Sequence, residues 1–318
     1  MNVIVTGGAG FIGSHVVNRL LEEGHGVTVI DDFNDYYNPE IKRGNVAAYG
    51  GEVRVVEGDI RDRELVRSVF AEAKADAVIH LAARAGVRPS IQDPVLYVDT
   101  NINGTMNLLE AAREFGVTEM VFASSSSVYG ENKKVPFAED DLLEGVVSPY
   151  AATKLSGEHL CSNYAKHFGV NIRSLRFFTV YGPGQRPDLA ISKFVRLVES
   201  GQPIERYGDG STGRDYTYIS DIVDGVMAAL AYRETPFEIF NLGGSNSVSL
   251  GRLIEIVEEA TGKKAEVIEL PDQPGDVPFT AADVSKSGRL LGYSPKVRIE
   301  DGVKRYVEWF RSTEAARS

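Results

Sequence analysis

The sequence has one cysteine, Cys161, among 318 residues. A single cysteine excludes an intramolecular disulfide framework and favours a reducing compartment, so we expect a cytoplasmic protein. No apolar run approaches the roughly 18 residues that a membrane span requires. The N-terminus also lacks the basic region and long apolar stretch of a signal peptide. These absences predict a protein that is neither secreted nor inserted into a membrane.

Positive charge is also scarce. The chain has 34 Lys and Arg against 45 Asp and Glu, a formal net charge of −11. This balance opposes nucleic acid or an anionic membrane as a partner, but it leaves room for a local basic pocket. The five histidines lack metal-ligand spacing, and we predict no metal site. His80 lies in an apolar strand and is interpreted as a core residue, as is Cys161.

What is present is an alternation of short β-branched runs with helical periodicity. Strands are expected at 2–6, 27–30, 53–56, 77–81, 120–123 and 171–177. Helices are expected after the first strand, up to Gly24, and at 63–73, 98–115 and 149–168. Strand–helix units of this length predict an α/β fold, with a doubly wound parallel sheet that helices cover on both faces.

The composition changes near Gly182, where clusters of Gly, Pro and Asp begin and the expected helices shorten to 191–199, 219–231 and 250–261. We predict a sheet domain over residues 1–181. Residues 182–318 then form a smaller, mixed α/β substrate lobe, interleaved with the first domain because no long linker separates them. The tail after Phe310 is expected to fray.

A glycine-rich turn, TGGAGFIG at residues 6–13, joins the first strand to the first helix. In such a turn Gly7 permits the tight bend, Gly10 admits a pyrophosphate and Gly13 lets the helix pack closely. The helix N-terminus adds unpaired N–H groups and a positive dipole end. The context predicts a dinucleotide-binding Rossmann domain; the alternative is a merely flexible turn.

Acidic residues at the ends of the next strands bear on the cofactor. Asp31 lies 18 residues after Gly13, where a carboxylate accepts hydrogen bonds from ribose and repels a 2′-phosphate. This favours NAD over NADP, although Lys42 and Arg43 leave NADP open. Asp59 is expected either to hold the adenine amine or to cap a helix.

A second motif, SPYAATK at 148–154, starts the helix expected at 149–168. Tyr150 and Lys154 are four residues apart and share a helix face. An ammonium beside a phenol lowers the phenol pKa and makes it a base for an alcohol proton. Four serines, 124–127, end the fifth strand and offer hydroxyl groups to the same substrate oxygen. The alternatives are a chance spacing on an amphipathic helix and a polar serine turn.

Together these motifs resemble those of the extended short-chain dehydrogenase/reductase superfamily over nearly the whole chain. Within it, the sequence is most similar to the nucleotide-sugar 4-epimerases that act on UDP-glucuronate. The segments that carry this likeness are DFNDYY at 32–37, ARAGVR at 83–88, FFTVYGP at 177–183 and QRPD at 185–188. The resemblance implies bound NAD, a UDP-sugar substrate and a homodimer packed through helices 98–115 and 149–168.

Departures from related enzymes narrow the reaction. Dehydratases and decarboxylases of the superfamily carry an acid in the segment that is 124–127 here, so dehydration is disfavoured. UDP-galactose 4-epimerases usually have Asn at the position of Thr179, and the shorter residue favours a uronic acid, unless it merely packs. Arg186 and Arg214 are the expected diphosphate partners, although Arg214 has an alternative as an ion pair with Asp215.

The predicted sites follow from the motifs and the resemblance. The catalytic residues are Ser125, Tyr150 and Lys154. The residues expected to contact the cofactor are Tyr150 and Lys154, together with Gly7, Gly10, Phe11, Ile12, Gly13, Asp31, Asp32, Asn34, Asp59, Ile60, Leu81, Ala82, Ala83, Arg84 and Asn101. The expected substrate contacts are Arg88, Ser125, Ser126, Ser127, Thr179, Arg186, Arg214 and Asp276.

The expected reaction is C4 epimerisation of UDP-glucuronate to UDP-galacturonate through a 4-keto sugar, with Tyr150 as base. A first alternative is an epimerase of UDP-glucose and UDP-galactose. A second is a protein that binds NAD and nucleotide sugars without turnover, because a fold alone does not give a function.

Overall fold

The structure is a computed structural model that describes residues 1–143, 145–271 and 279–315. Its main layer is a seven-stranded sheet in the order β10-β6-β5-β4-β1-β2-β3, with every neighbouring pair parallel. The strands are β1 (Asn2–Thr6), β2 (Gly26–Asp31), β3 (Arg54–Glu57), β4 (Ala77–His80), β5 (Glu119–Ser125), β6 (Asn171–Phe177) and β10 (Phe237–Leu242). The predicted doubly wound parallel sheet is confirmed.

Helices cover both faces of this sheet and contribute apolar side chains to the hydrophobic core on each face. On one face lie α1 (Phe11–Glu22) and α9 (Ile219–Ala231), whose buried side chains join one hydrophobic cluster. On the other lie α3 (Arg63–Ala73), α6 (Gly104–Phe115) and α7 (Pro149–Phe168). The short α2 (Pro39–Ala47) follows β2 at the edge of the sheet.

The helix expected at 98–115 is helical but not uniform. It consists of α5 (Pro94–Val98), a π-helical turn η1 (Asp99–Asn103) and α6, and α4 (Val87–Gln92) precedes it. Such widened turns often occur at functional sites. Here the turn carries the buried side chain of Asn101, which is hydrogen-bonded to both backbone groups of Arg84.

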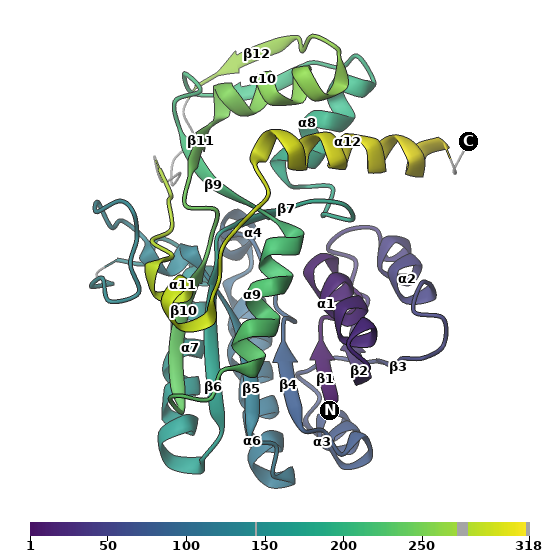
Figure 1. Cartoon of the computed structure of the whole chain (residues 1–318), viewed down its shortest axis with the longest axis vertical. Coiled ribbons are helices and arrows are strands. Elements are labelled where there is room, and N and C mark those ends of the chain that lie inside the picture. The colour runs from purple at the N-terminus through teal and green to yellow at the C-terminus, as the bar shows by residue number, and fades with distance from the viewer. Residues whose placement is uncertain (144, 272–278, 316–318) are drawn as a thin grey trace.

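Most of the remaining elements lie above the carboxyl ends of the strands (Figure 1). They include two small sheets, with the orders β11-β9-β7 and β12-β8. The elements are η2 (Ser126–Tyr129), β7 (Thr179–Tyr181), α8 (Ala190–Glu199), β8 (Ile204–Tyr207), β9 (Gly213–Tyr218), β11 (Ser247–Ser249), α10 (Leu250–Thr261), β12 (Val267–Leu270), α11 (Ser285–Leu291) and α12 (Ile299–Ala315). The division at residues 181 and 182 stays a prediction; α9 and β10 follow that boundary yet belong to the layers of the large sheet.

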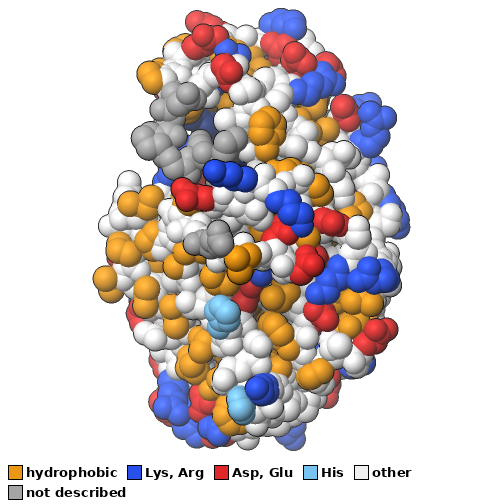
Figure 2. Space-filling view, turned by 90° about the vertical axis from the view of Figure 1, so that its left-hand side faces the viewer, with side chains coloured by type: hydrophobic (Ala, Val, Ile, Leu, Met, Phe, Trp, Pro, Cys, Tyr) orange, Lys and Arg blue, Asp and Glu red, His pale blue; other side chains and the backbone are white. Residues whose placement is uncertain are grey.

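The surface mixes polar and apolar groups. On the face shown in Figure 2, charged side chains of both signs lie among groups of hydrophobic ones. Among the described residues, no helix is both long and apolar enough to cross a membrane.

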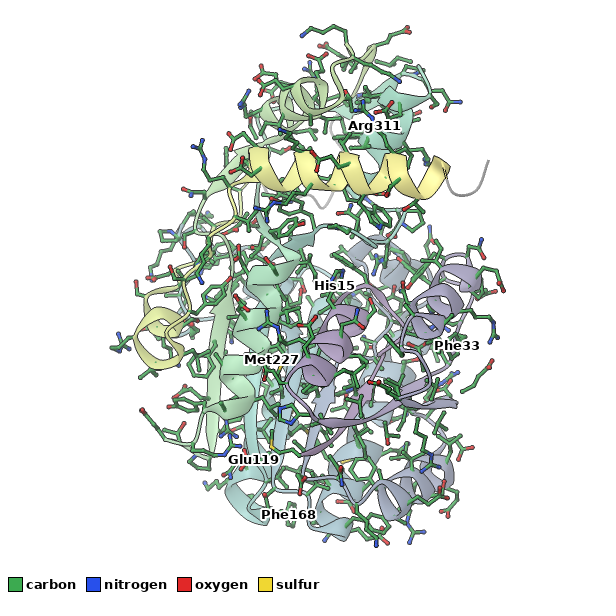
Figure 3. The ribbon with its side chains drawn as sticks, turned by 45° about the vertical axis from the view of Figure 1, so that its right-hand side comes forward. His15, Phe33, Glu119, Phe168, Met227 and Arg311 are labelled. Atoms are coloured by element: carbon green, nitrogen blue, oxygen red, sulfur yellow. The ribbon has the colours of Figure 1, made fainter. Side chains whose placement is uncertain are left out.

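The expectation that the chain frays after Phe310 is wrong up to residue 315, because α12 continues through it. Arg311 fastens this last turn: its guanidinium donates to Glu199 Oε1 at 2.8 Å and to the carbonyl oxygen of Thr261 at 2.7 Å. These contacts join α12 to the C-terminal ends of α8 and α10, and Figure 3 labels Arg311 there.

Candidate active site

A cleft of about 420 Å³ opens at the carboxyl ends of the parallel strands, where ligands of open α/β sheets bind. The glycine turn forms one wall. Gly7 has a left-handed φ of +71°, and an added Cβ would lie 2.8 Å from the backbone nitrogen of Ala82. A Cβ on Gly13 would lie only 2.1 Å from the carbonyl oxygen of Gly7. The N-cap Gly10 supplies no capping side chain, so the first N–H groups of α1 are available to a phosphate.

Asp31 ends β2 beside this turn. Its carboxylate accepts the N–H of Ala9 at 3.1 Å and that of Phe33 at 3.0 Å. Burial raises the pKa of Asp31, while the Lys42 ammonium 3.8 Å away opposes the rise. Asp31 thus braces the glycine turn as well as lining the cleft, a role that the sequence pattern did not reveal.

Lys42 and Arg43, the two cations that left NADP binding open, are both paired with acidic side chains. Lys42 lines the cleft, but it lies beside Asp31 and donates to the carbonyl oxygen of Asn34 at 3.2 Å. Arg43 pairs with Glu57 and is not among the residues that line this cleft. The geometry therefore favours a ribose hydroxyl over a 2′-phosphate.

The expectation that Asp59 caps a helix is wrong. The N-cap of α3 is Asp62, which accepts the N–H groups of Glu64 and Leu65. Asp59 instead lines the cleft and pairs with Arg61 at 2.6 Å. Its contact with an adenine stays a prediction.

The end of β4 forms the floor of the cleft, with Leu81, Ala82, Ala83 and Arg84 among the lining residues. Asn101 was expected to contact the cofactor but does not line the cleft. It lies behind, where it accepts the N–H of Arg84, donates to the Arg84 carbonyl oxygen and donates to Thr153 Oγ1. Its neighbour Thr100 lines the cleft instead. Asn101 is therefore a support for Arg84.

Ser125, Tyr150 and Lys154 meet at the opposite wall, and all three line the cleft. The Tyr150 and Ser125 hydroxyl groups are hydrogen-bonded to each other. The Tyr97 ring contacts the Tyr150 ring edge-on, with centroids 6.2 Å apart, and orients it. Lys154 donates to the carbonyl oxygen of Ala123 at 2.7 Å.

The electrostatics of Tyr150 differ from the sequence-based expectation. Burial raises the pKa of the phenol, and the hydrogen bond with Ser125 and the positive charge of Arg186 oppose that rise. The Lys154 ammonium donates to the Ala123 carbonyl oxygen, and the expectation that its charge lowers the phenol pKa stays a prediction. Burial also lowers the pKa of Lys154, to about 8.

Hydroxyl groups and one arginine line the remaining wall. Ser126, Thr179 and Arg186 line the cleft, as does Ser124. Arg186 pairs with Asp188 through two hydrogen bonds, of 3.0 and 2.7 Å, and lies over the ring of Tyr36 at 5.0 Å.

Other expected substrate contacts are not among the lining residues. Ser127 donates its N–H and its hydroxyl to Ser125 Oγ, so it supports that hydroxyl. Arg88 and Arg214 also do not line the cleft. Asp276 lies outside the described residues.

The alternative that Arg214 forms a surface ion pair with Asp215 is wrong, because Asp215 is fully buried. Its carboxylate accepts the N–H groups of Gly244, Ser245 and Ala282. Burial raises the pKa of Asp215 to about 6. This carboxylate ties β9 to the segments around residues 244 and 282.

Sequence reasoning missed several lining residues. Tyr36 and Tyr37 stand in the loop after β2, and Phe177 and Phe178 at the end of β6. The tyrosine pair was noticed only as a family signature. Adjacent aromatic residues just after a strand end are a signal that would have placed them at the cleft.

The histidine and cysteine interpretations are confirmed. His80 is buried between the hydroxyl groups of Thr6 and Thr105, at 2.7 and 2.9 Å. Cys161 is a buried free thiol. Within residues 1–143, 145–271 and 279–315, no group of three His, Cys, Asp or Glu could hold a metal ion.

The fold and site thus define a dinucleotide-dependent enzyme that carries a tyrosine base. In agreement, residues 3–243 match the NAD dependent epimerase/dehydratase family, and the chain belongs to that family. A UDP-glucuronate 4-epimerase of Thermodesulfobacterium geofontis is 44% identical over 96% of this chain and 95% of its own.

Solved structures are also similar to this chain. The UDP-glucuronic acid 4-epimerase of Bacillus cereus, in complex with UDP-glucuronic acid and NAD, has a TM-score of 0.92 at 38% identity. The match covers 98% of this chain and 100% of that one. The UDP-glucose 4-epimerase of Thermotoga maritima, with UDP-glucose, has a TM-score of 0.92 at 35% identity, over 99% and 100%.

The glycine turn gives a direct test of cofactor binding. We predict that Gly13→Ala lowers the affinity for NAD by more than about tenfold, or about 1.4 kcal/mol, because its Cβ overlaps the Gly7 carbonyl. The measurement is the NAD content of purified protein, with calorimetric titration of added NAD. Gly44→Ala is the matched control, since its Cβ meets nothing within 4 Å. Equal NAD binding by both variants contradicts the assignment.

Proposed function

We propose that this protein catalyses the NAD-dependent epimerisation of UDP-glucuronate to UDP-galacturonate at C4. The observation that carries the proposal is one cleft holding both the glycine turn and the hydrogen-bonded Tyr150–Ser125 pair. Relatives and solved structures named for this reaction support it. When bound, NAD supplies the acceptor for the C4 hydride and its donor on return.

The chain's own residues handle the proton. Tyr150 Oη takes the proton of the C4 hydroxyl group as the carbonyl forms, and gives it back when the alcohol re-forms. Ser125 Oγ, supported by Ser127, hydrogen-bonds the same oxygen. Arg186 opposes the rise in phenol pKa that burial causes, so it favours the phenolate. The 4-keto sugar turns about its diphosphate between the two hydride transfers.

A uronic acid suits the hydroxyl-lined wall. Ser126 and Thr179 present hydroxyl groups to the cleft, and Arg186 adds a positive charge. A 4-keto uronate is a β-keto acid, which loses CO₂ only when the C5–C6 bond stands perpendicular to the carbonyl plane. Hydrogen bonds that fix the carboxylate away from this geometry protect the intermediate.

The neutral-hexose reading is the second candidate. It rests on the similarity to the UDP-glucose 4-epimerase of Thermotoga maritima. Turnover of UDP-glucose alone identifies it. The reading without turnover conflicts with the intact Tyr150, Ser125 and Lys154 in one cleft.

We also propose a homodimer in the cytoplasm. The single cysteine favours a cytoplasmic location. For the dimer, α4, α5 and α7 are neighbours, and α4 and α5 expose Ile91, Val95 and Val98, with Val95 75% exposed. Apolar side chains on adjacent helices provide the self-complementary patch that a two-fold dimer buries.

Purified protein incubated with UDP-glucuronate and no added cofactor should yield UDP-galacturonate up to an equilibrium mixture. Chromatography and proton NMR resolve the products, with UDP-glucose in a parallel reaction. A pentose nucleotide among the products would mean decarboxylation. Conversion of UDP-glucose alone would replace the proposed substrate with the neutral hexose.

Tyr150→Phe should lower kcat by about 10²–10⁴, the usual contribution of a general acid–base group, with little change in KM. Steady-state kinetics with UDP-glucuronate measure this. Tyr164→Phe is the control on the same helix, because its hydroxyl group contacts Glu110 and not the cleft. Full turnover by the Tyr150 variant would sink the proposed mechanism.

Sedimentation equilibrium should give twice the chain mass of 34.7 kDa. Val98→Asp should shift this towards the monomer, since a charge in an apolar interface is desolvated without a partner. Ile268→Asp, an exposed position on β12, should leave the mass unchanged. A monomeric wild-type protein refutes the dimer.

A further inference from the structure

Three side chains on one face of helix α7, spaced four residues apart, contact the end of β5. Tyr150 is hydrogen-bonded to the Ser125 hydroxyl group, and Lys154 donates to the Ala123 carbonyl oxygen at 2.7 Å. Glu158, four residues further on, accepts a 2.5 Å hydrogen bond from Ser124 Oγ. Residues spaced by four lie in a row along a helix, so α7 contacts three consecutive residues of one strand.

Glu158 also reaches the next strand. Arg176 of β6 donates to Glu158 Oε1 at 2.9 Å and to Oε2 at 2.8 Å. Ser124 and Arg176 are register partners on β5 and β6, so the carboxylate spans both strands where they end. Both charged side chains are 3% exposed. The Arg176 guanidinium also lies over the ring of Tyr129 in η2, the turn that follows Ser125.

We propose that Glu158 is a positioning residue of the epimerase, which fixes the register of α7 on β5 so that Tyr150 meets Ser125 and Lys154 meets Ala123. A buried ion pair is poorly explained by stability alone, because apolar residues of similar volume often serve as well. Its bidentate geometry instead fixes one arrangement of α7, β5 and β6. The proposal rests on the proposed function for its kinetic consequences, but the geometry can be tested without the reaction.

The same carboxylate places a negative charge one turn from Lys154. Burial lowers the pKa of Lys154 to about 8, and the negative charge of Glu158 opposes that fall. His80 on β4 also faces this ammonium and is held neutral by its burial, while the charge of Arg176 on β6 is paired with Glu158. Loss of the Glu158 charge should therefore lower the Lys154 pKa further.

Two substitutions distinguish the effect of the length of the Glu158 side chain from the effect of its charge. Glu158→Asp keeps the charge but is too short to contact both Ser124 and Arg176, so kcat should fall about tenfold, or 1.36 kcal/mol, with the pH profile unmoved. Glu158→Gln keeps the length but loses the charge. It should lower kcat and move the alkaline limb of the pH profile, where Lys154 loses its proton, to lower pH.

The matched control is a second Arg–Glu pair, which joins β6 to β5. Arg173 of β6 donates to Glu119 of β5 at 2.9 Å, but Glu119 begins the strand that Ser125 ends. Figure 3 labels Glu119 in the lower part of the molecule, remote from the cleft at the carboxyl ends of the strands. Glu119→Gln should therefore lower the melting temperature while leaving kcat and the alkaline limb as in wild type.

A direct titration makes the test independent of the sugar. In protein labelled with ¹³C at the lysine ε-carbon, a signal absent from Lys154→Arg should titrate near pH 8 in wild type and at lower pH in Glu158→Gln. A wild-type protein that is inert on UDP-sugars refutes the proposed function, and the titration still decides this inference. Wild-type kcat in Glu158→Asp, or an unmoved Lys154 titration in Glu158→Gln, overturns it. An equal shift in Glu119→Gln also overturns it.

Discussion

Parallel pairing of β1 with β4, β4 with β5 and β5 with β6 is the constraint on which the site depends. Because these strands run in one direction, their carboxyl ends lie at one edge, and the chain leaves each of them there. The glycine turn, the Leu81–Arg84 segment, the serine run and Thr179 are all such strand exits. Residues more than 170 positions apart thus line one cleft without a long loop to bring them together.

Along one wall of this cleft, backbone segments lie so close together that no side chain fits between them. The opposite wall is held in place by buried charged side chains. At the glycine turn the backbone of α1 lies against that of β1 and β4 so closely that a Cβ on Gly7 or Gly13 would overlap it. At the opposite wall, polar side chains of α7 contact the end of β5 and set the distance between the helix and the strand. Although the chain carries a net charge of −11, Arg84 and Arg186 place positive charge in this cleft.

Local patterns were sufficient for the fold and for the centre of the site. Strand composition and helix spacing predicted six of the sheet strands, and short motifs predicted the glycine turn and the Tyr150–Lys154 pair. What they did not predict depends on contacts between distant segments. Asn101 faces Arg84 rather than the cleft because of a π-helical turn, and residues 311–315 stay helical because Arg311 finds partners on α8 and α10. The phenol pKa likewise depends on Arg186, 36 positions from Tyr150.

The central claim is that C4 of the sugar loses and regains the same hydride within this cleft. The most direct test uses UDP-glucuronate with deuterium at C4, incubated with the enzyme as purified in ordinary water, and follows the label by NMR and mass spectrometry. The account predicts UDP-galacturonate that retains the deuterium at C4, with none released to solvent. Replacement of the deuterium by solvent hydrogen would contradict it, because the inversion would then proceed by removal of a proton from carbon.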